Sequence, residues 1–262
     1  MTSALPRRLV GIGFVIGLIT GVFGGLVGLG GGVLMIPLLT GWGKLTQHDA
    51  HATSLAAIIA AGVSGSVTYA RAGALDWSAA ILLGSVATIA TYGAAHSSRR
   101  IHAMRLRRMF GVFLFLAAVL LVLKDELLTL RAPVGALEIS LLLASGLLVG
   151  VTSGLLGVGG GALMVPLMVI TMDMAQHVAQ GTSLAAMVPA AVSGTAAHVR
   201  NRKVRFGVLL GLVPGISFGT WGGGTLALEL PTSTLRLTLA LVLALMSVHH
   251  LRERAPAGTA ER

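Results

Sequence analysis

Long apolar stretches, interrupted by short charged or glycine- and proline-rich segments, dominate the chain. Eight of them approach or reach the roughly 20 residues that a helix needs to cross about 30 Å of hydrocarbon. Two others, at 30–42 and 159–171, are clearly shorter and cannot span a membrane unaided. The pattern predicts an all-α polytopic membrane protein with about eight long transmembrane helices and two short broken or re-entrant helices. The long helices are expected near 9–27, 54–70, 78–95, 107–123, 137–157, 183–199, 207–225 and 235–251.

The second half of the chain repeats the first at one constant spacing, so that Gly21 corresponds to Gly150 and Gln47 to Gln176. Residues 21–39 match residues 150–168 at 12 of 19 positions, and residues 47–57 match residues 176–186 at 8 of 11. A duplicated unit of roughly 115 residues therefore accounts for most of the sequence. We expect a cytoplasmic N-terminus at 1–8, a first repeat at 9–124, an extracytoplasmic linker at 125–136, a second repeat at 137–251 and a cytoplasmic tail at 252–262.

The composition agrees with a membrane protein. Hydrophobic residues make up 55% of the chain and charged residues 11%, with a mean hydropathy of +0.88, whereas soluble domains carry about 25% charge. The net charge of +10 does not indicate nucleic acid as a partner, because Lys and Arg lie in short loops between apolar runs. With the N-terminus in the cytoplasm, 15 of the 19 basic residues fall on the cytoplasmic side. We therefore expect a multi-pass protein of the bacterial inner membrane, embedded in the lipid bilayer, with both termini cytoplasmic.

The two halves distribute their positive charge in opposite ways. The loop at 71–77 is nearly neutral and the loop at 96–108 is basic, whereas the corresponding loop at 199–206 is basic and that at 225–237 is not. Because basic loops stay in the cytoplasm, the halves are expected to be inverted relative to each other. Inverted repeats are common in secondary transporters, whose ligand site lies between the repeats near mid-membrane. An anion channel and a non-transporting scaffold subunit remain alternatives.

A glycine cluster precedes each short apolar run. Glycine costs about 1 kcal/mol relative to alanine inside a helix, and Pro37 and Pro166, which follow the clusters, each lack an amide donor. Irregular backbone at membrane depth persists only where protein or a water-filled cavity covers it. The exposed amides can hold an anion beside the positive end of the next helix; close helix packing is the alternative explanation. The clusters comprise Gly28, Gly30, Gly31 and Gly32, and Gly157, Gly159, Gly160 and Gly161.

A further glycine series favours packing. Gly207, Gly211, Gly215, Gly219 and Gly223 recur at every fourth position and form one smooth stripe on a helix. A neighbouring helix, or a second copy of the chain in a homodimer, would be able to approach this stripe closely.

The remaining candidate residues follow the short runs. All nine acidic residues lie near the ends of apolar runs or in loops, which favours an anionic or neutral substrate over a cation. Thr53 with Ser54, and Thr182 with Ser183, are either helix caps or hydroxyl ligands for an oxyanion. His48 and His177 are either interfacial residues or proton-coupling groups, since imidazole changes its charge near neutral pH.

Enzyme function is not expected. The chain lacks HExxH, GxSxG and Walker motifs, so it does not carry the residues that hydrolysis or ATP-driven transport would require. It also has no cysteine, which excludes thiol chemistry. No catalytic residue, metal site or cofactor is predicted.

The paired strings GVxxGLxGxGGGxLMxPL and HxAxxTSLAA resemble the TauE/SafE family of sulfite exporters. The resemblance covers both repeats and therefore most of the chain. It implies a permease that exports a small anion, such as sulfite or an organosulfonate like sulfoacetate. By this likeness the two glycine clusters occupy the family's signature positions, and the Thr-Ser pairs occupy its second block.

Overall fold

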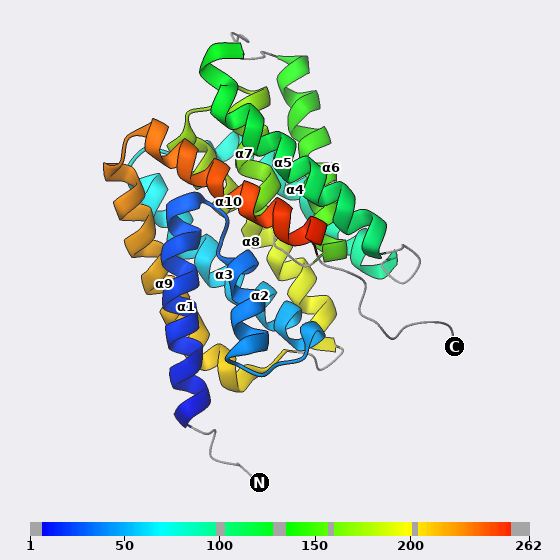
Figure 1. Cartoon of the computed structure of the whole chain (residues 1–262), viewed down its shortest axis with the longest axis vertical. Coiled ribbons are helices and arrows are strands. Elements are labelled where there is room, and N and C mark those ends of the chain that lie inside the picture. The colour runs from blue at the N-terminus through cyan, green and yellow to red at the C-terminus, as the bar shows by residue number, and fades with distance from the viewer. Residues whose placement is uncertain (1–6, 98–102, 128–134, 157–159, 201–203, 253–262) are drawn as a thin grey trace.

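The computed structural model describes residues 7–97, 103–127, 135–156, 160–200 and 204–252 (Figure 1). Every regular element in these ranges is an α-helix, which confirms the predicted all-α class. Each predicted apolar run coincides with one helix. The helices are α1 (Arg7–Val27), α2 (Gly32–Gly41), α3 (Gln47–Arg71), α4 (Trp77–Ser97), α5 (Ala103–Leu127), α6 (Ala136–Leu156), α7 (Gly161–Thr171), α8 (Gln176–Arg200), α9 (Phe206–Glu229) and α10 (Thr232–Arg252).

Four of these helices are long and apolar enough to cross a membrane when only the described residues are considered. They are α1, α3, α4 and α9. Shorter apolar helical segments lie at 111–124, 139–154 and 232–248, and α2 and α7 contain 10 and 11 residues. The presence of helices that are long and apolar enough to cross a membrane is therefore confirmed, whereas the full set of eight spans stays a prediction.

The two sets of five helices follow the same plan along the chain. α1 begins at Arg7, and α6 begins at Ala136, which is the repeat counterpart of Arg7. The first residues of the other four pairs of matching helices correspond in the same way. The helix boundaries thus keep the spacing that the sequence repeat predicts. This agreement extends the repeat from a few matched strings to the positions of all ten described helices.

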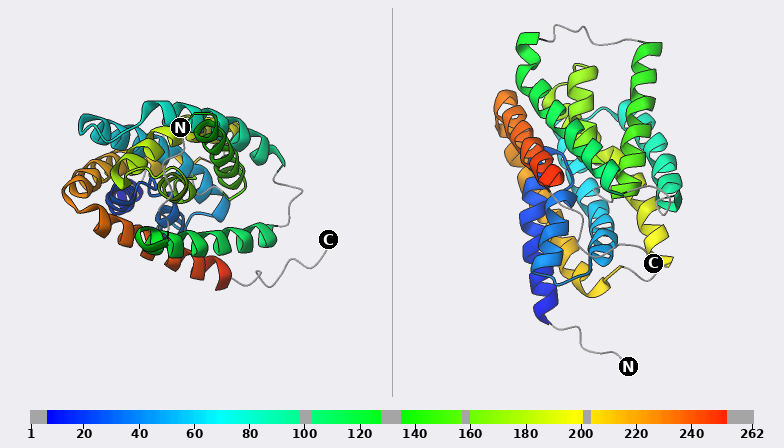
Figure 2. Two further views of the ribbon diagram at one scale, coloured as in Figure 1. Left: turned by 90° about the horizontal axis from the view of Figure 1, so that it is seen from above. Right: turned by 45° about the vertical axis from the view of Figure 1, so that its right-hand side comes forward.

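The helices form two flanks around a central pair. α1 packs against α9 on one flank, α4 packs against α6 on the other, and α3 and α8 contact each other between them (Figure 2). α3 also contacts α9, α8 contacts α4, and α5 contacts α10. In Figure 1, α1 ascends from the end where the chain begins, whereas α6 descends from the opposite end.

Glycines bring α1 and α9 into backbone contact. A Cβ added at Gly17 would lie 2.8 Å from the Ile216 nitrogen, and one added at Gly219 would lie 2.8 Å from the Val22 nitrogen. The stripe on α9 therefore meets a second stripe on α1, which confirms that it packs against a neighbouring helix. The α1 stripe consists of Gly13, Gly17, Gly21 and Gly25.

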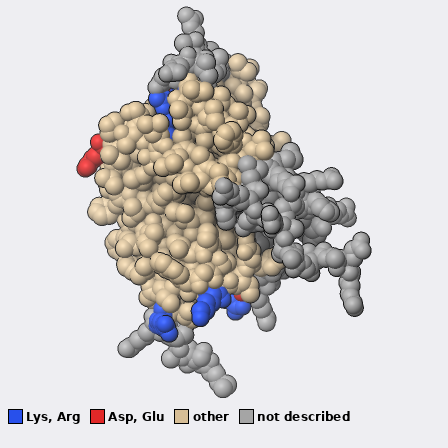
Figure 3. All heavy atoms as spheres, in the orientation of Figure 1, with Lys and Arg blue, Asp and Glu red and all other residues tan. Residues whose placement is uncertain are grey.

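The outer surface has an apolar band between two charged ends. Large side chains such as Ile89, Phe115 and Leu241 are 75%, 55% and 61% exposed. Figure 3 shows a broad face without charged side chains, with described Lys and Arg residues toward its two ends. Such a band suits contact with lipid hydrocarbon, because burying charge there is costly.

Candidate functional site

The first glycine cluster separates α1 from α2 by a turn that glycine favours. The φ angles of Gly28, Gly30 and Gly31 are 78°, 66° and 76°, in the left-handed region where other residues are strained. The amides of Gly28 and Leu29 donate to the Gly24 carbonyl, at 2.9 and 3.1 Å. The predicted interruption of the helix at this cluster is confirmed.

The second cluster has the same conformation where it is described. Gly160, immediately before α7, has a φ of 74°, and the buried Gly161 begins the helix. Gly157 and Gly159 lie outside the described residues. Gly31 and Gly160 are the N-cap residues of α2 and α7, and neither helix has a side-chain cap. The first amide groups of both short helices therefore have no hydrogen-bond acceptor on a cap side chain.

The two clusters meet in the interior of the protein. A Cβ added at Gly161 would lie 2.9 Å from the Leu29 Cα and 2.9 Å from the Met187 sulfur. One added at Gly30 would lie 3.2 Å from the Met187 methyl carbon and 3.6 Å from Ile58. Ile58 and Met187 are repeat counterparts on α3 and α8, and both are buried. The starts of α2 and α7 therefore lie close to each other, beside the central helix pair.

Polar side chains of α8 bind the carbonyl groups around the first cluster. Ser183 Oγ donates to the Gly28 carbonyl at 3.1 Å, and Gln180 Nε2 donates to the Leu26 carbonyl at 3.1 Å. These bonds satisfy backbone acceptors that the end of α1 leaves open. They also tie the second half of the chain to the break in the first half.

A buried tyrosine completes this network. The Tyr69 hydroxyl lies 2.9 Å from the Gly25 carbonyl and 3.0 Å from Gln180 Oε1. Its single proton serves one of these acceptors at a time. Sequence reasoning missed Tyr69, which lies outside the matched strings, and Gln180, which lies at one of the positions of 176–186 where the two copies differ; an isolated phenol within a helix of small residues was the available signal.

Thr53 and Thr182 anchor the loops that lead into α9 and α4. The Arg205 amide donates to Thr53 Oγ1 at 3.1 Å, and the Asp76 amide donates to Thr182 Oγ1 at 3.0 Å. Arg205 and Asp76 are themselves repeat counterparts, so each bond joins one half of the chain to the other. We call these two bonds the Thr53 and Thr182 latches.

The helix-cap interpretation of the Thr-Ser pairs is wrong. α3 begins at Gln47, where Thr46 is the N-cap and its side chain accepts from the Asp49 amide. α8 begins at Gln176, also well before its Thr-Ser pair. Small polar residues can start a helix, but here both helices begin six residues before the Thr-Ser pairs, at Gln47 and Gln176. All four hydroxyl residues are fully buried, and Ser54 Oγ donates to the His51 carbonyl at 3.3 Å.

An ion pair lies beside the Thr53 latch. Two guanidinium nitrogens of Arg205 lie 2.9 and 2.8 Å from Asp49 Oδ2. Both residues line a hollow of about 520 Å³ that also contains Lys44 and Leu9. This hollow lies at the end where α1 begins. Asp49 is 8% exposed, and such a carboxylate requires a partner; sequence reasoning did not predict this pair.

The two histidines lie at opposite ends of the molecule. His48 is exposed in the first turn of α3, near the hollow that contains Lys44. His177 Nε2 lies 3.1 Å from the Ala227 carbonyl at the end of α9. The structure therefore does not bring the two imidazoles together.

The fold and its centre define a helical multi-pass membrane protein in which glycine-rich breaks of two halves meet. The family profile described as Sulfite exporter TauE/SafE matches residues 12–250. The chain belongs to this family of membrane transporters, as the sequence motifs predict.

Proteins from several microorganisms are similar to the chain over most of its length. "Probable membrane transporter protein YunE" of Bacillus subtilis is 28% identical, over 91% of this chain and 96% of that protein. "Probable membrane transporter protein YdhB" of the same organism is 25% identical, over 86% and 93%. A "Probable membrane transporter protein" of Haemophilus influenzae is 24% identical, over 90% and 95%. No solved structure matches the chain.

Proposed function

We propose that the protein is a secondary transporter that exports a small anion, with sulfite or an organosulfonate such as sulfoacetate as cargo. The observation that carries this proposal is the meeting of two helix N-termini, without side-chain caps, in the buried centre. Each contributes free amides and the positive end of a helix dipole. The substrate-binding residues would be the two glycine clusters with Thr53, Ser54, Thr182 and Ser183.

The chemistry of the centre favours an anion. The side chains described there are apolar, hydroxyl, amide or phenol groups, among them Met187, Ser183, Gln180 and Tyr69. The described acidic residue that is most buried, Asp49, is neutralised by Arg205 at one end of the protein. A sulfite or sulfonate group has three oxygens that accept hydrogen bonds, so converging amides and hydroxyls match it. The family's description as sulfite exporters supports the same class of cargo.

We propose that residues 9–124 and 137–251 are inverted repeats that rock against each other. The helix contacts support this arrangement, because exchanging each helix with its counterpart converts the α1 and α9 pair into the α6 and α4 pair. The same exchange leaves the α3 and α8 pair unchanged. The opposite directions of α1 and α6 in Figure 1 also support it. Rocking would break the Thr53 latch and the Thr182 latch in turn, and would give the anion access from each side.

The proposed orientation places the end with Lys44 and Arg205 in the cytoplasm of the bacterial inner membrane. Lys44 and Arg205 lie together with the start of α1 around one hollow. Basic residues at that end would attract an anion before it enters. Both chain termini would then be cytoplasmic.

The proposal is tested by anion flux in vesicles reconstituted with the purified protein. Under anaerobic conditions, labelled sulfite should enter with saturation, and vesicles preloaded with unlabelled sulfite should exchange it faster than empty vesicles. Sulfoacetate, sulfate and chloride serve as competitors that separate sulfonates, other oxyanions and simple anions. Flux without saturation or exchange would identify a channel instead, and absence of flux for the whole panel would support a scaffold.

The same assay, repeated across a range of pH, tests proton coupling. His48→Gln and His177→Gln should flatten the pH dependence of sulfite flux if the imidazoles carry the coupled proton. Each variant is compared with the parent protein at a saturating sulfite concentration. An unaltered profile in both variants would remove these residues from the mechanism.

A further inference from the structure

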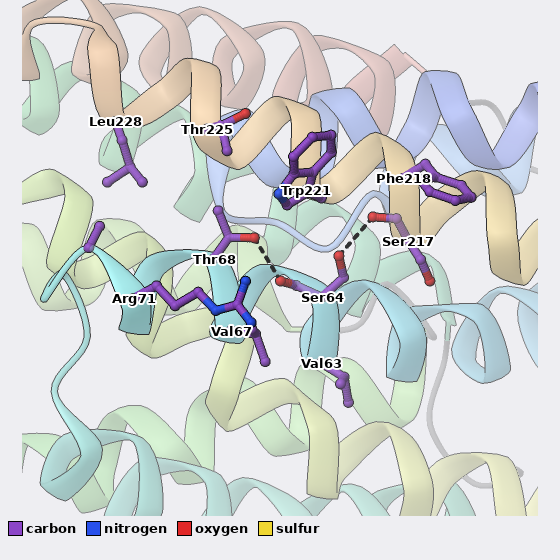
Figure 4. A pocket seen from close by; sticks show the side chains of 11 residues that line it. Val63, Ser64, Val67, Thr68, Arg71, Ser217, Phe218, Trp221, Thr225 and Leu228 are labelled. Atoms are coloured by element: carbon purple, nitrogen blue, oxygen red, sulfur yellow. Dashed lines mark hydrogen bonds between the residues drawn. The ribbon is translucent and has the colours of Figure 1, made fainter.

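A groove of about 660 Å³ runs along the outside of the protein between α3 and α9. Its lining comprises mainly apolar side chains, with Val67, Trp221 and Leu228 among them. Figure 4 shows Trp221 projecting from α9 toward Thr68 on α3. Val67 is 45% exposed and Trp221 is 56% exposed, so the groove opens on the apolar flank rather than toward the buried centre.

The hydroxyl groups in the groove are occupied by the protein itself. Ser64 Oγ donates to the Ser217 carbonyl at 2.7 Å, and Thr68 Oγ1 donates to the Ser64 carbonyl at 2.9 Å (Figure 4). Thr225 Oγ1 donates to the Gly222 carbonyl at 2.9 Å. The floor of the groove therefore has no hydroxyl proton that requires an outside acceptor. Such a surface suits a hydrocarbon chain better than a polar solute.

The length of the groove corresponds to one leaflet of a bilayer. Its lining extends from Val63 to Arg71 on α3 and from Ser217 to Leu228 on α9. At the helical rise per residue these distances are about 12 and 16 Å. Half of the hydrocarbon thickness of a bilayer is about 15 Å.

A basic side chain closes one end of the groove. Arg71 is the last residue of α3 and is exposed. Its side chain lies back along α3 beside Val67, so the guanidinium faces the groove (Figure 4). Within the part of the chain that the structure describes, no carboxylate forms an ion pair with it. A guanidinium matches the geometry of a phosphate group and binds it through two hydrogen bonds.

We propose that this groove binds an anionic phospholipid, with the phosphate at Arg71 and one acyl chain along α3 and α9. The polar end of the groove and its apolar floor lie in the order that such a lipid requires. α9 also packs against the glycine stripe of α1, and α3 against α8. The bound lipid would thus contact one helix of the flank, α9, and one helix of the central pair, α3.

The experiment uses the fluorescence of Trp221. Trp42 and Trp77 are replaced by phenylalanine, so that Trp221 is the single tryptophan of the full-length chain. The protein is reconstituted in phosphatidylcholine vesicles that contain the same fraction of brominated phosphatidylglycerol or brominated phosphatidylcholine, whose bromine atoms quench a nearby indole. Brominated phosphatidylglycerol should occupy the groove about five-fold more often than brominated phosphatidylcholine. This is the factor expected when one basic side chain attracts an anionic headgroup at the membrane surface.

Arg71→Gln should abolish this preference, whereas Arg8→Gln, an exposed residue at the opposite end of the protein, should retain it. Equal quenching by both lipids in the parent, or a preference that survives Arg71→Gln, would overturn the proposal. Weak quenching by either lipid would also overturn it and would indicate a second copy of the chain over the groove. The assay measures no flux, so its outcome is independent of the proposed transport.

Discussion

Glycine serves different purposes at different positions of this chain. Gly30 and Gly73 have nearly the same left-handed backbone, with φ angles of 66° and 70°. A Cβ added at Gly73 meets no atom within 4 Å, whereas one added at Gly30 faces Met187 and Ile58 in the centre. A comparison of alanine at these two positions therefore separates the destabilisation caused by the left-handed backbone from the effect of the added methyl group on the proposed site.

We expect Gly30→Ala to impair transport and Gly73→Ala to preserve it. Both substitutions place alanine in the left-handed region and should lower the free energy of unfolding by a similar amount, about 1–2 kcal/mol. Only Gly30→Ala adds a methyl group beside the amides that would hold the anion. Sulfite flux should fall about ten-fold or more, the factor that corresponds to about 1.4 kcal/mol.

Flux and thermal unfolding are measured on the same preparations of both variants. Equal flux in the two variants would show that the first glycine cluster has only a structural role. The added methyl at Gly30 meets the flexible end of Met187, so the variant is expected to fold. Gly31→Leu is a less informative choice, because its side chain would also collide with the Thr20 carbonyl in α1.

At the scale of elements, the pairing of α1 with α9 depends on glycines from both helices. A Cβ at Gly215 would lie 3.0 Å from the Leu18 nitrogen, and backbone atoms cannot move aside as a flexible side chain can. Gly222, on the same helix, has no such neighbour within 4 Å. The backbones of α1 and α9 therefore lie close together along the face of α9 that contains Gly215, but not along the face that contains Gly222.

We expect Gly215→Leu to destabilise the protein by about 3 kcal/mol or more, at the upper end of the range for overpacking. Gly222→Leu should be neutral or stabilising, because leucine is the better helix former and its side chain has space. Thermal unfolding in detergent and the monodisperse fraction in gel filtration measure the difference. Equal stability of the two variants would contradict the close contact of α1 and α9.

The equivalent pair on the other flank, α4 with α6, uses fewer glycines. Gly146 and Gly150 of α6 face α4, but the positions of α4 that correspond to the α9 stripe include Val86 and Ala90. The two flanks therefore share their arrangement without sharing their residues. Duplication conserved the pairing of helices, while the side chains at each interface diverged.

At the scale of the whole molecule, the absence of cysteine in the sequence makes the inverted arrangement directly testable. Single cysteines are introduced by Lys44→Cys, Phe206→Cys and Trp77→Cys, at three exposed residues, and by Ser98→Cys in the basic loop at 96–108. A membrane-impermeant maleimide applied to intact cells should label only the Trp77→Cys protein. The three others should react after the membrane is opened, because their loops would be cytoplasmic.

Labelling of positions 98 and 206 from opposite sides of the membrane would refute the inverted repeats. The parent protein, which has no thiol, measures the background of the assay. Flux of each variant in vesicles shows that the labelled protein retains the fold. The experiment therefore decides the orientation of both halves from one set of variants.

The sequence by itself determined the helices and their duplication. Apolar runs long enough to cover the hydrocarbon core must form helices, because no other single segment satisfies its own backbone in lipid. The first glycine cluster was also predictable as a break, since glycine and the following Pro37 weaken helix locally. These properties depend on residues that are near each other in the chain.

The tertiary structure decided which groups meet. Ser183 reaches Gly28, Tyr69 reaches Gln180, and Thr53 accepts from the Arg205 amide, contacts that join the two halves of the chain. Local preference suggested caps for the Thr-Ser pairs, but helices that begin several residues earlier bury them instead. Burial then requires partners for each hydroxyl. Ser54 bonds to the nearby His51 carbonyl, whereas the partners of Thr53, Thr182 and Ser183 come from the other half of the chain. Hydrogen-bond partners in the centre are therefore a consequence of packing between the halves, which no local pattern in the sequence specifies.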